Sequence, residues 1–229
     1  QKRLTTTQQA LLKIQKELTT YYTQKIFEYT KPNPFLMAEL KKQHAYFQKI
    51  RTQKITSEQL QAMLDPHPII LMGDYHPFKP SQNEFFDLVR ATHARGTPCV
   101  VVLESLLATE RKELQNFLEG HITSGEFLDE VDFNRYWGFP SYSTEKMMHF
   151  CRREKIPLYG MNLSRMTKAQ KHKSLFKDRE AHFSKIIAET QKTHPESQIF
   201  ALVGNLHLMP NNFSAQWKKE NPSTPIIYI

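Results

Sequence analysis

The feature that most constrains the fold is an alternation that begins after Asp65-Pro66. Short apolar runs bounded by Pro, Gly and polar residues alternate there with amphipathic segments of helical length. The runs are apolar through most of their length, as in strands of a parallel sheet covered on both faces. The alternation therefore predicts an α/β fold, with a mostly parallel central sheet flanked by helices. The expected strands are 68–73, 99–103, 156–161, 199–203 and 226–229.

The residues before this alternation are predicted to be helical. Apolar side chains recur at steps of three and four along 7–29, which places them on one helix face. Pro32 and Pro34 end this segment, and two shorter helices are expected near 35–47 and 58–64. We therefore expect an N-terminal helical arm over 1–65, followed by an α/β domain over 66–229 that forms one compact unit.

The charge of the chain is concentrated in this arm. Residues 1–60 carry 11 Lys and Arg against 4 Asp and Glu, a net +7 of the total +8. The excess leaves peripheral association with an anionic lipid surface open, but the cations are interleaved with Glu and apolar residues, as on a solvated helix face. We expect no nucleic-acid partner. No apolar run approaches the roughly 18 residues that a membrane-spanning helix needs.

Polar residues follow four of the expected strands. Gly73-Asp74-Tyr75-His76 follows the first, Glu104 the second, Asn162 the third and Gly204-Asn205-Leu206-His207 the fourth. Ligands of open parallel sheets bind beyond the carboxyl ends of the strands. We therefore expect these side chains at one rim, with Gly73 and Gly204 letting the backbone turn closely beside them.

Two kinds of chemistry fit this set. Asp74, His76, Glu104 and His207 would suit a divalent metal ion with an open position for water, or general-base activation of water without metal. The alternatives stay open that the histidines are satisfied structural residues, that Asp74 forms a turn and that Glu104 sits in the first turn of a helix. The sequence lacks the G-x-S-x-G elbow and the glycine-rich phosphate loops, which argues against a serine hydrolase and against NAD or ATP.

The motifs that carry this chemistry resemble a known family. The match includes GDYHPFKPSQ, VVLES, LQNFLEGHITSGEFLD and RYWGFPSYSTEKMMHFCRREKIPLYGMNLSR, and continues through KDREAHFSKII to IFALVGNLHL. Together they are similar to the ChaN-like haem-binding branch of the Tiki superfamily, which also includes TraB and erythromycin-esterase-like proteins. Residues 1–60 lie outside the resemblance.

The resemblance implies a haem-binding protein that takes part in iron or haem uptake, located in the cell envelope as a lipoprotein. It leaves a homodimer open, although no signal or lipobox is visible in the sequence. The residues implied to bind the cofactor are Tyr75, His76, Asn162, Arg165 and His207, with Tyr75 as an implied ligand of the iron. Aromatic residues would cover the macrocycle, namely Phe78, Trp137, Phe139 and Tyr142.

Relatives in the superfamily also imply a second reading, a hydrolase of the Tiki or erythromycin-esterase type. Its catalytic residues would be His76, Glu104 and His207, which hold a metal ion or orient water, with Arg179 stabilising an oxyanion. Asp74 stands where the family usually has Glu, which bears on the geometry of the site. A third reading is a non-catalytic interaction module that acts through the basic helices.

Overall fold

The computed structural model describes residues 5–29, 34–49, 54–76, 79–163 and 172–229. It divides the chain into two compact units, Gln1–Ile50 and Arg51–Ile229. The first contains α1 (Thr6–Tyr29) and α2 (Pro34–Phe47), at the positions predicted from the apolar spacing. Among the described helices, none is both long enough and apolar enough to cross a bilayer.

The boundary between the two compact units falls between Ile50 and Arg51. The helix α3 (Ser57–Leu64) belongs to the second unit, whereas the expected arm extended to residue 65. Thr56 and Gln59 form a capping box at its start, and Leu64 is fully buried in the core of the second unit. The side chain of Gln198 also donates to the carbonyl of Leu64, 2.9 Å away. Burial and hydrogen bonding therefore attach this helix to the α/β unit.

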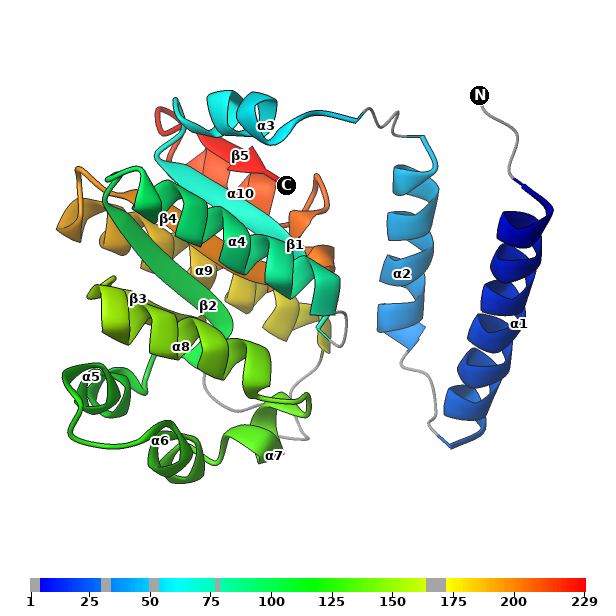
Figure 1. Cartoon of the computed structure of the whole chain (residues 1–229), viewed down its shortest axis with the longest axis horizontal. Helices are drawn as coiled ribbons and strands as arrows, with labels where there is room; N and C mark the ends of the chain where they lie inside the picture. Colours follow the sequence, from blue (N-terminus) through cyan, green and yellow to red (C-terminus); the bar gives the residue numbers. More distant parts are fainter. Residues whose placement is uncertain (1–4, 30–33, 50–53, 77–78, 164–171) are drawn as a thin grey trace. The chain divides into compact units, whose positions relative to one another are not determined.

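The second unit is built on a five-stranded sheet in the order β3-β2-β4-β1-β5 (Figure 1). Every strand pair is parallel, which confirms the α/β prediction and shows that the sheet is parallel throughout its described strands. The strands are β1 (Ile69–Asp74), β2 (Cys99–Leu107), β3 (Leu158–Asn162), β4 (Gln198–Gly204) and β5 (Ile226–Tyr228).

Helices cover both faces of this sheet. Those after the first three strands are α4 (Lys79–Ala94), α5 (Arg111–Glu119), α6 (Ser124–Glu130), α7 (Phe133–Trp137), α8 (Tyr142–Glu154) and α9 (His172–Thr193). The fourth strand runs into the 3-10 helix η1 (Asn205–Leu208) and then α10 (Phe213–Glu220). The short α7 and η1 were not predicted, because a single turn leaves no periodic pattern.

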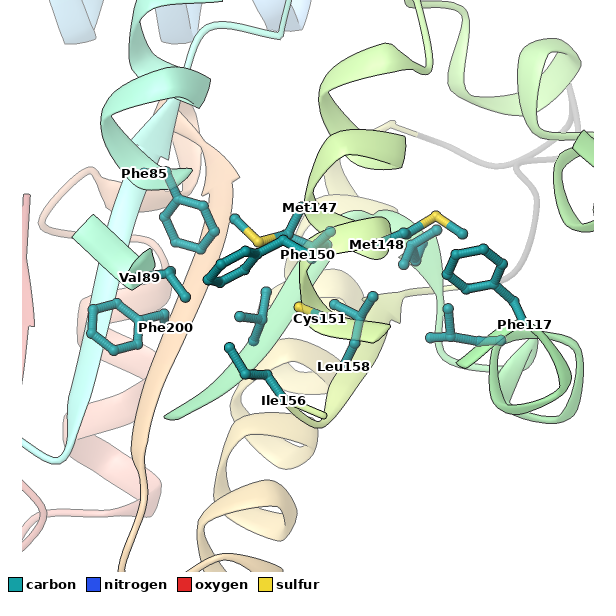
Figure 2. Close-up of a cluster of buried hydrophobic side chains, with 14 of the residues drawn as sticks. Phe85, Val89, Phe117, Met147, Met148, Phe150, Cys151, Ile156, Leu158 and Phe200 are labelled. Carbon is teal, nitrogen blue, oxygen red and sulfur yellow. The ribbon is translucent and has the colours of Figure 1, made fainter. Parts of the chain in front are cut away.

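Alternate residues of the strands point to opposite faces of the sheet and belong to two separate hydrophobic cores. Ile70, Val101 and Phe200 pack with side chains of α4 and α8, as Figure 2 shows for Phe85, Val89 and Phe150. Their neighbours in the strands pack against α9 and α10 on the opposite face. This two-sided burial explains why the strands read as unbroken apolar runs rather than as alternating ones.

The pairing of β2 with β3 contains an irregularity next to the rim. The register shifts between Leu103 and Leu107, and β2 continues to Leu107 instead of ending at the predicted residue 103. Gly160 lies opposite this bulge, where an added Cβ would sit only 2.4 Å from the carbonyl oxygen of Leu107. Bulges re-aim side chains near functional sites, and this one begins at Glu104.

Substituting Gly160 therefore tests the bulge. Because the obstructing atom is backbone, we expect Gly160→Ala to lower the free energy of unfolding by about 1–3 kcal/mol in urea titrations. The control is Gly125→Ala on the exposed first turn of α6, where the new Cβ meets only a side-chain atom 4.0 Å away. It should change stability by less than about 1 kcal/mol. Equal stability of the two variants would contradict this packing.

Candidate functional site

The carboxyl ends of the central strands bring the predicted polar residues together. Asp74 and Gly204 are register partners at the ends of β1 and β4, and Glu104 lies on β2, the other neighbour of β4. The structure places Asp74, His76, Glu104 and His207 at this rim, with Arg179 reaching it from α9. In Figure 1, α4 and α8 begin at the same edge, toward which β1 and β2 run.

Glu104 is the centre of a buried hydrogen-bond network. Its Oε2 accepts from the backbone N–H of Gly204 at 2.6 Å, and its Oε1 forms an ion pair with Nη2 of Arg179. The same Oε1 lies 3.4 Å from Nε2 of His207. The carboxylate therefore joins β2 to β4, to α9 and to η1, while only 3% of Glu104 is exposed.

A second carboxylate, which sequence reasoning missed, completes this network. Glu180 on α9 is buried, and its Oε1 lies 2.6 Å from Nδ1 of His207. The imidazole of His207 is thus held between two carboxylates, while Phe183 packs against its ring. The only signal available in the sequence was the position of Glu180 directly after Arg179, and this distinguishes it little from an exposed helical glutamate.

The charges of these groups shift one another's pKa values. Burial alone would raise the pKa of Glu104, but the charges of His207 and Arg179 outweigh it and hold that pKa well below its ordinary range. Burial would likewise lower the pKa of His207, but Glu104 and Glu180 raise it to about 9. Burial raises the pKa of Glu180. At neutral pH, His207 is therefore an imidazolium that neutralises buried negative charge.

His76, which lies in the turn just beyond β1, belongs to a different arrangement. Its Nδ1 lies 3.1 Å from Oδ2 of Asp74, whose buried carboxylate also accepts from Ser81 at 2.7 Å and from Gln82 at 3.1 Å. Because a carboxylate only accepts hydrogen bonds, Nδ1 of His76 is the donor in this pair, and the ring atom that faces away from Asp74 is Nε2. That atom lies beside Gly204, where an added Cβ would be 3.1 Å away.

Aromatic side chains and a small cavity surround His76. Its ring packs against Trp137 at 4.6 Å and against Phe139 at 5.2 Å between centroids. Beside it lies a cavity of about 30 Å³, whose walls include His76, Glu104, Ser105 and Thr144. This volume holds water but no sizeable organic molecule. The arrangement is that of a carboxylate-oriented imidazole beside a space for water.

The predicted metal site is not assembled in the structure. Within the described residues, no group of three or more His, Cys, Asp or Glu side chains is placed to hold a metal ion. The physical reason is that their ligand atoms are already engaged: Asp74 accepts from Ser81 and Gln82, and the guanidinium of Arg179 occupies Glu104. A metal ion at Glu104 would have to displace the guanidinium group of Arg179.

Other predicted residues lie outside this interior network. Tyr75 is 53% exposed, and Tyr142, at the start of α8, is 41% exposed. The Nζ atom of Lys79 lies 4.6 Å from the ring centroid of Tyr142. Asn162 ends β3, where its carbonyl accepts from the N–H of Ala108 at 3.0 Å, and it does not line the cavity. Arg165 and Phe78 lie outside the described residues.

Comparisons with known proteins agree with this architecture. The model of the family described as haem-binding uptake, Tiki superfamily, ChaN matches residues 60–175. A solved structure described as cofacial heme binding to ChaN of Campylobacter jejuni aligns with a TM-score of 0.54 and 17% identity, over 77% of this chain and 86% of that one. No curated protein matches this chain in sequence.

A bacterial toxin shares the fold at lower identity. The C-terminal region of Pasteurella multocida toxin, described as having a thiol-protease like catalytic triad, aligns with a TM-score of 0.52 and 13% identity. The alignment covers 67% of this chain and 21% of the toxin chain. At such identities, the likeness to both solved structures establishes a common fold.

The buried network makes stability depend on pH in a defined direction. The folded state raises the pKa of His207 from about 6.5 to about 9, so it binds more protons than the unfolded state between these values. The stabilisation is full below about pH 6.5 and is lost as the pH rises through about 9. Urea titrations across this interval should show falling stability that His207→Gln largely removes.

The matched control for this pH dependence is His121→Gln, which alters a histidine that is exposed on the surface. It should leave the fall in stability intact. If stability fell with rising pH as steeply in His207→Gln as in the wild type, the assignment of a positive charge to His207 would be contradicted.

Proposed function

Since this chain belongs to the ChaN haem-binding uptake family of the Tiki superfamily, we propose that its ligand is haem, bound on the outer surface of the rim beside Tyr75. The observation that carries this placement is the contrast between the two sides of the strand end. Tyr75 is 53% exposed, whereas His76, the next residue, turns its ring into the interior between Trp137 and Phe139.

The volume of the interior supports an outer site. The cavity beside His76 measures about 30 Å³, whereas pockets for organic ligands start at about 300 Å³. A porphyrin does not fit there. The surrounding groups are also committed, because Glu104 and His207 are bound to each other and to Arg179 and Glu180.

The outer surface offers what a haem needs. Iron in haem proteins accepts a tyrosine ligand, and Tyr75 and Tyr142 both present phenols to solvent near the rim. The partly buried rings of Trp137 and Phe139 pack on His76, next to Tyr75 in the chain, and supply an apolar surface for the macrocycle. The ammonium group of Lys79 is exposed beside Tyr142 and would pair with a propionate.

We extend the proposal to the oligomeric state and the cellular location in which haem is bound. Campylobacter jejuni ChaN is described as binding heme cofacially, and a haem held on an exposed surface here would leave one face open to a second haem on a second copy of the chain. We therefore propose a haem-linked homodimer in the cell envelope that takes part in iron or haem uptake.

The N-terminal unit supports peripheral membrane association in this proposal. In α1, Leu11, Ile14, Leu18 and Tyr21 are all exposed and recur at steps of three and four, which gives an apolar stripe. The surrounding residues carry the excess of Lys and Arg already noted, which favours an anionic lipid surface.

The haem site is tested by titrating haemin into the full chain and following the Soret band. Tyr75→Phe removes the proposed ligand oxygen while keeping the ring, so we expect weaker binding by about tenfold or more and a shifted band. Tyr46→Phe, which alters another exposed tyrosine in the N-terminal unit, is the control and should behave as the wild type. Identical titrations for both variants would refute Tyr75 as the ligand, and absence of any Soret band would refute haem binding.

A second function, hydrolysis by activated water, is favoured by one specific observation. The Asp74–His76 pair directs Nε2 of His76 toward the interior, next to a cavity sized for water. A histidine oriented by a carboxylate is a general base in many hydrolases. In this proposal Arg179 and His207, both cationic at neutral pH, would stabilise negative charge that develops near Glu104.

This second function predicts slow hydrolysis of an activated ester such as p-nitrophenyl acetate. His76→Gln should lower the rate by about a hundredfold or more, because it removes the base but keeps a polar side chain. His149→Gln, at an exposed position on α8, should retain the rate. A rate equal to that of buffer for the wild type, or an unchanged rate in His76→Gln, would exclude the activity.

A further inference from the structure

A second and larger cavity, with a lining separate from that of the cavity beside His76, lies between α5, α9 and the edge strand β3. We propose that it is a binding site for a small organic acid with an aromatic or aliphatic body, independent of the haem surface. Its volume of about 380 Å³ falls within the range of pockets that hold organic ligands, about 300–1,000 Å³. The cavity beside His76 is more than ten times smaller.

The shape of this cavity follows from the order of the strands. β3 is the last of the described strands on its side of the sheet, and none of the others covers its outer edge. α5 and α9 both pack against β3, and the cavity lies where these three elements meet. In Figure 1 β3 lies at one end of the sheet, with α5 and α9 near it.

The walls combine apolar surface with one fixed aromatic ring. Leu107, Leu114 and Ile186 supply aliphatic surface from β2, α5 and α9. The ring of Tyr159 is held in place because its hydroxyl lies 2.8 Å from Nε2 of His194. Such a wall suits a flat or aliphatic group, which would lose contact with water on binding.

The charged side chains of the wall select an anion. Arg111 and Lys192 line the cavity, and among the described residues neither forms an ion pair. The one carboxylate of the lining, Glu189, lies 3.8 Å from Nζ of Lys185 on its own helix. The guanidinium of Arg111 is placed 5.1 Å above the ring of Tyr159, so an acid group that bound it would lie beside the apolar wall.

Neither of the proposed functions uses this cavity. Its lining shares no residue with the cavity at the rim, and it contains none of Tyr75, His76, Glu104 or His207. The polar residues of α9 that serve the rim, Arg179 and Glu180, precede the segment that lines this cavity, Ile186 to Thr193. Binding here can therefore be tested separately from haem.

The test uses indole-3-acetate as the acid and indole-3-ethanol as its neutral counterpart. Binding to the full chain is followed by shifts of backbone amide resonances in NMR spectra. We expect indole-3-acetate to shift the amides of Gly160 and Thr190 at millimolar concentration, and indole-3-ethanol to bind about tenfold more weakly. Arg111→Gln should weaken binding of the acid by about tenfold and have little effect on the neutral compound.

Lys112→Gln is the matched control, because it removes the same charge from the next exposed position of α5 without touching the cavity. It should bind the acid as the wild type does, and saturation with haemin should leave that affinity unchanged. The proposal is overturned by shifts that map elsewhere, by equal effects of the two substitutions, by displacement of the acid by haemin, or by no shift with the acid.

Discussion

The structure depends most on the compensation of one buried charge, that of Glu104. A carboxylate with 3% exposure is costly unless donors and cations surround it. The chain supplies them from three places, the N–H of Gly204 on β4, Arg179 on α9 and His207 on η1. Because these contacts require β2, β4 and α9 to meet at one rim, the charge network and the parallel sheet specify the same arrangement.

The same compensation of charge explains why the buried and the exposed residues of the rim have different roles. Since Glu104, Glu180, Arg179 and His207 neutralise one another, the interior network presents no ready set of ligands for a metal ion. β1 ends at Asp74, so Tyr75 and His76 lie in the turn that follows the strand. There His76 turns inward to Asp74 and the cavity, while Tyr75 remains outside and free to meet a larger ligand. Surface haem binding and interior acid–base chemistry are therefore compatible in geometry.

Much of the fold could be predicted from the sequence, because burial on both faces makes each strand an apolar run and because capping residues mark helices. Thr123 and Glu126, for example, form a capping box at the start of α6. The meeting of His76, Glu104 and His207 followed from the rule that parallel strands end at one rim. The role of Glu180 could not be predicted, since its burial depends on how α9 packs. The inward orientation of His76 could not be predicted either, because it depends on Asp74 and on the positions of Trp137 and Phe139.

The central claim is that haem iron is bound from outside by a tyrosine and not by the inward-facing histidines. Resonance Raman spectroscopy of the ferric haemin complex of the full chain tests it most directly. The account predicts a high-spin spectrum with vibrations of an iron-bound phenolate, and loss of those vibrations when Tyr75 is changed to Phe. A low-spin spectrum of the kind given by two histidine ligands would contradict it, because His76 and His207 could then not occupy the positions described.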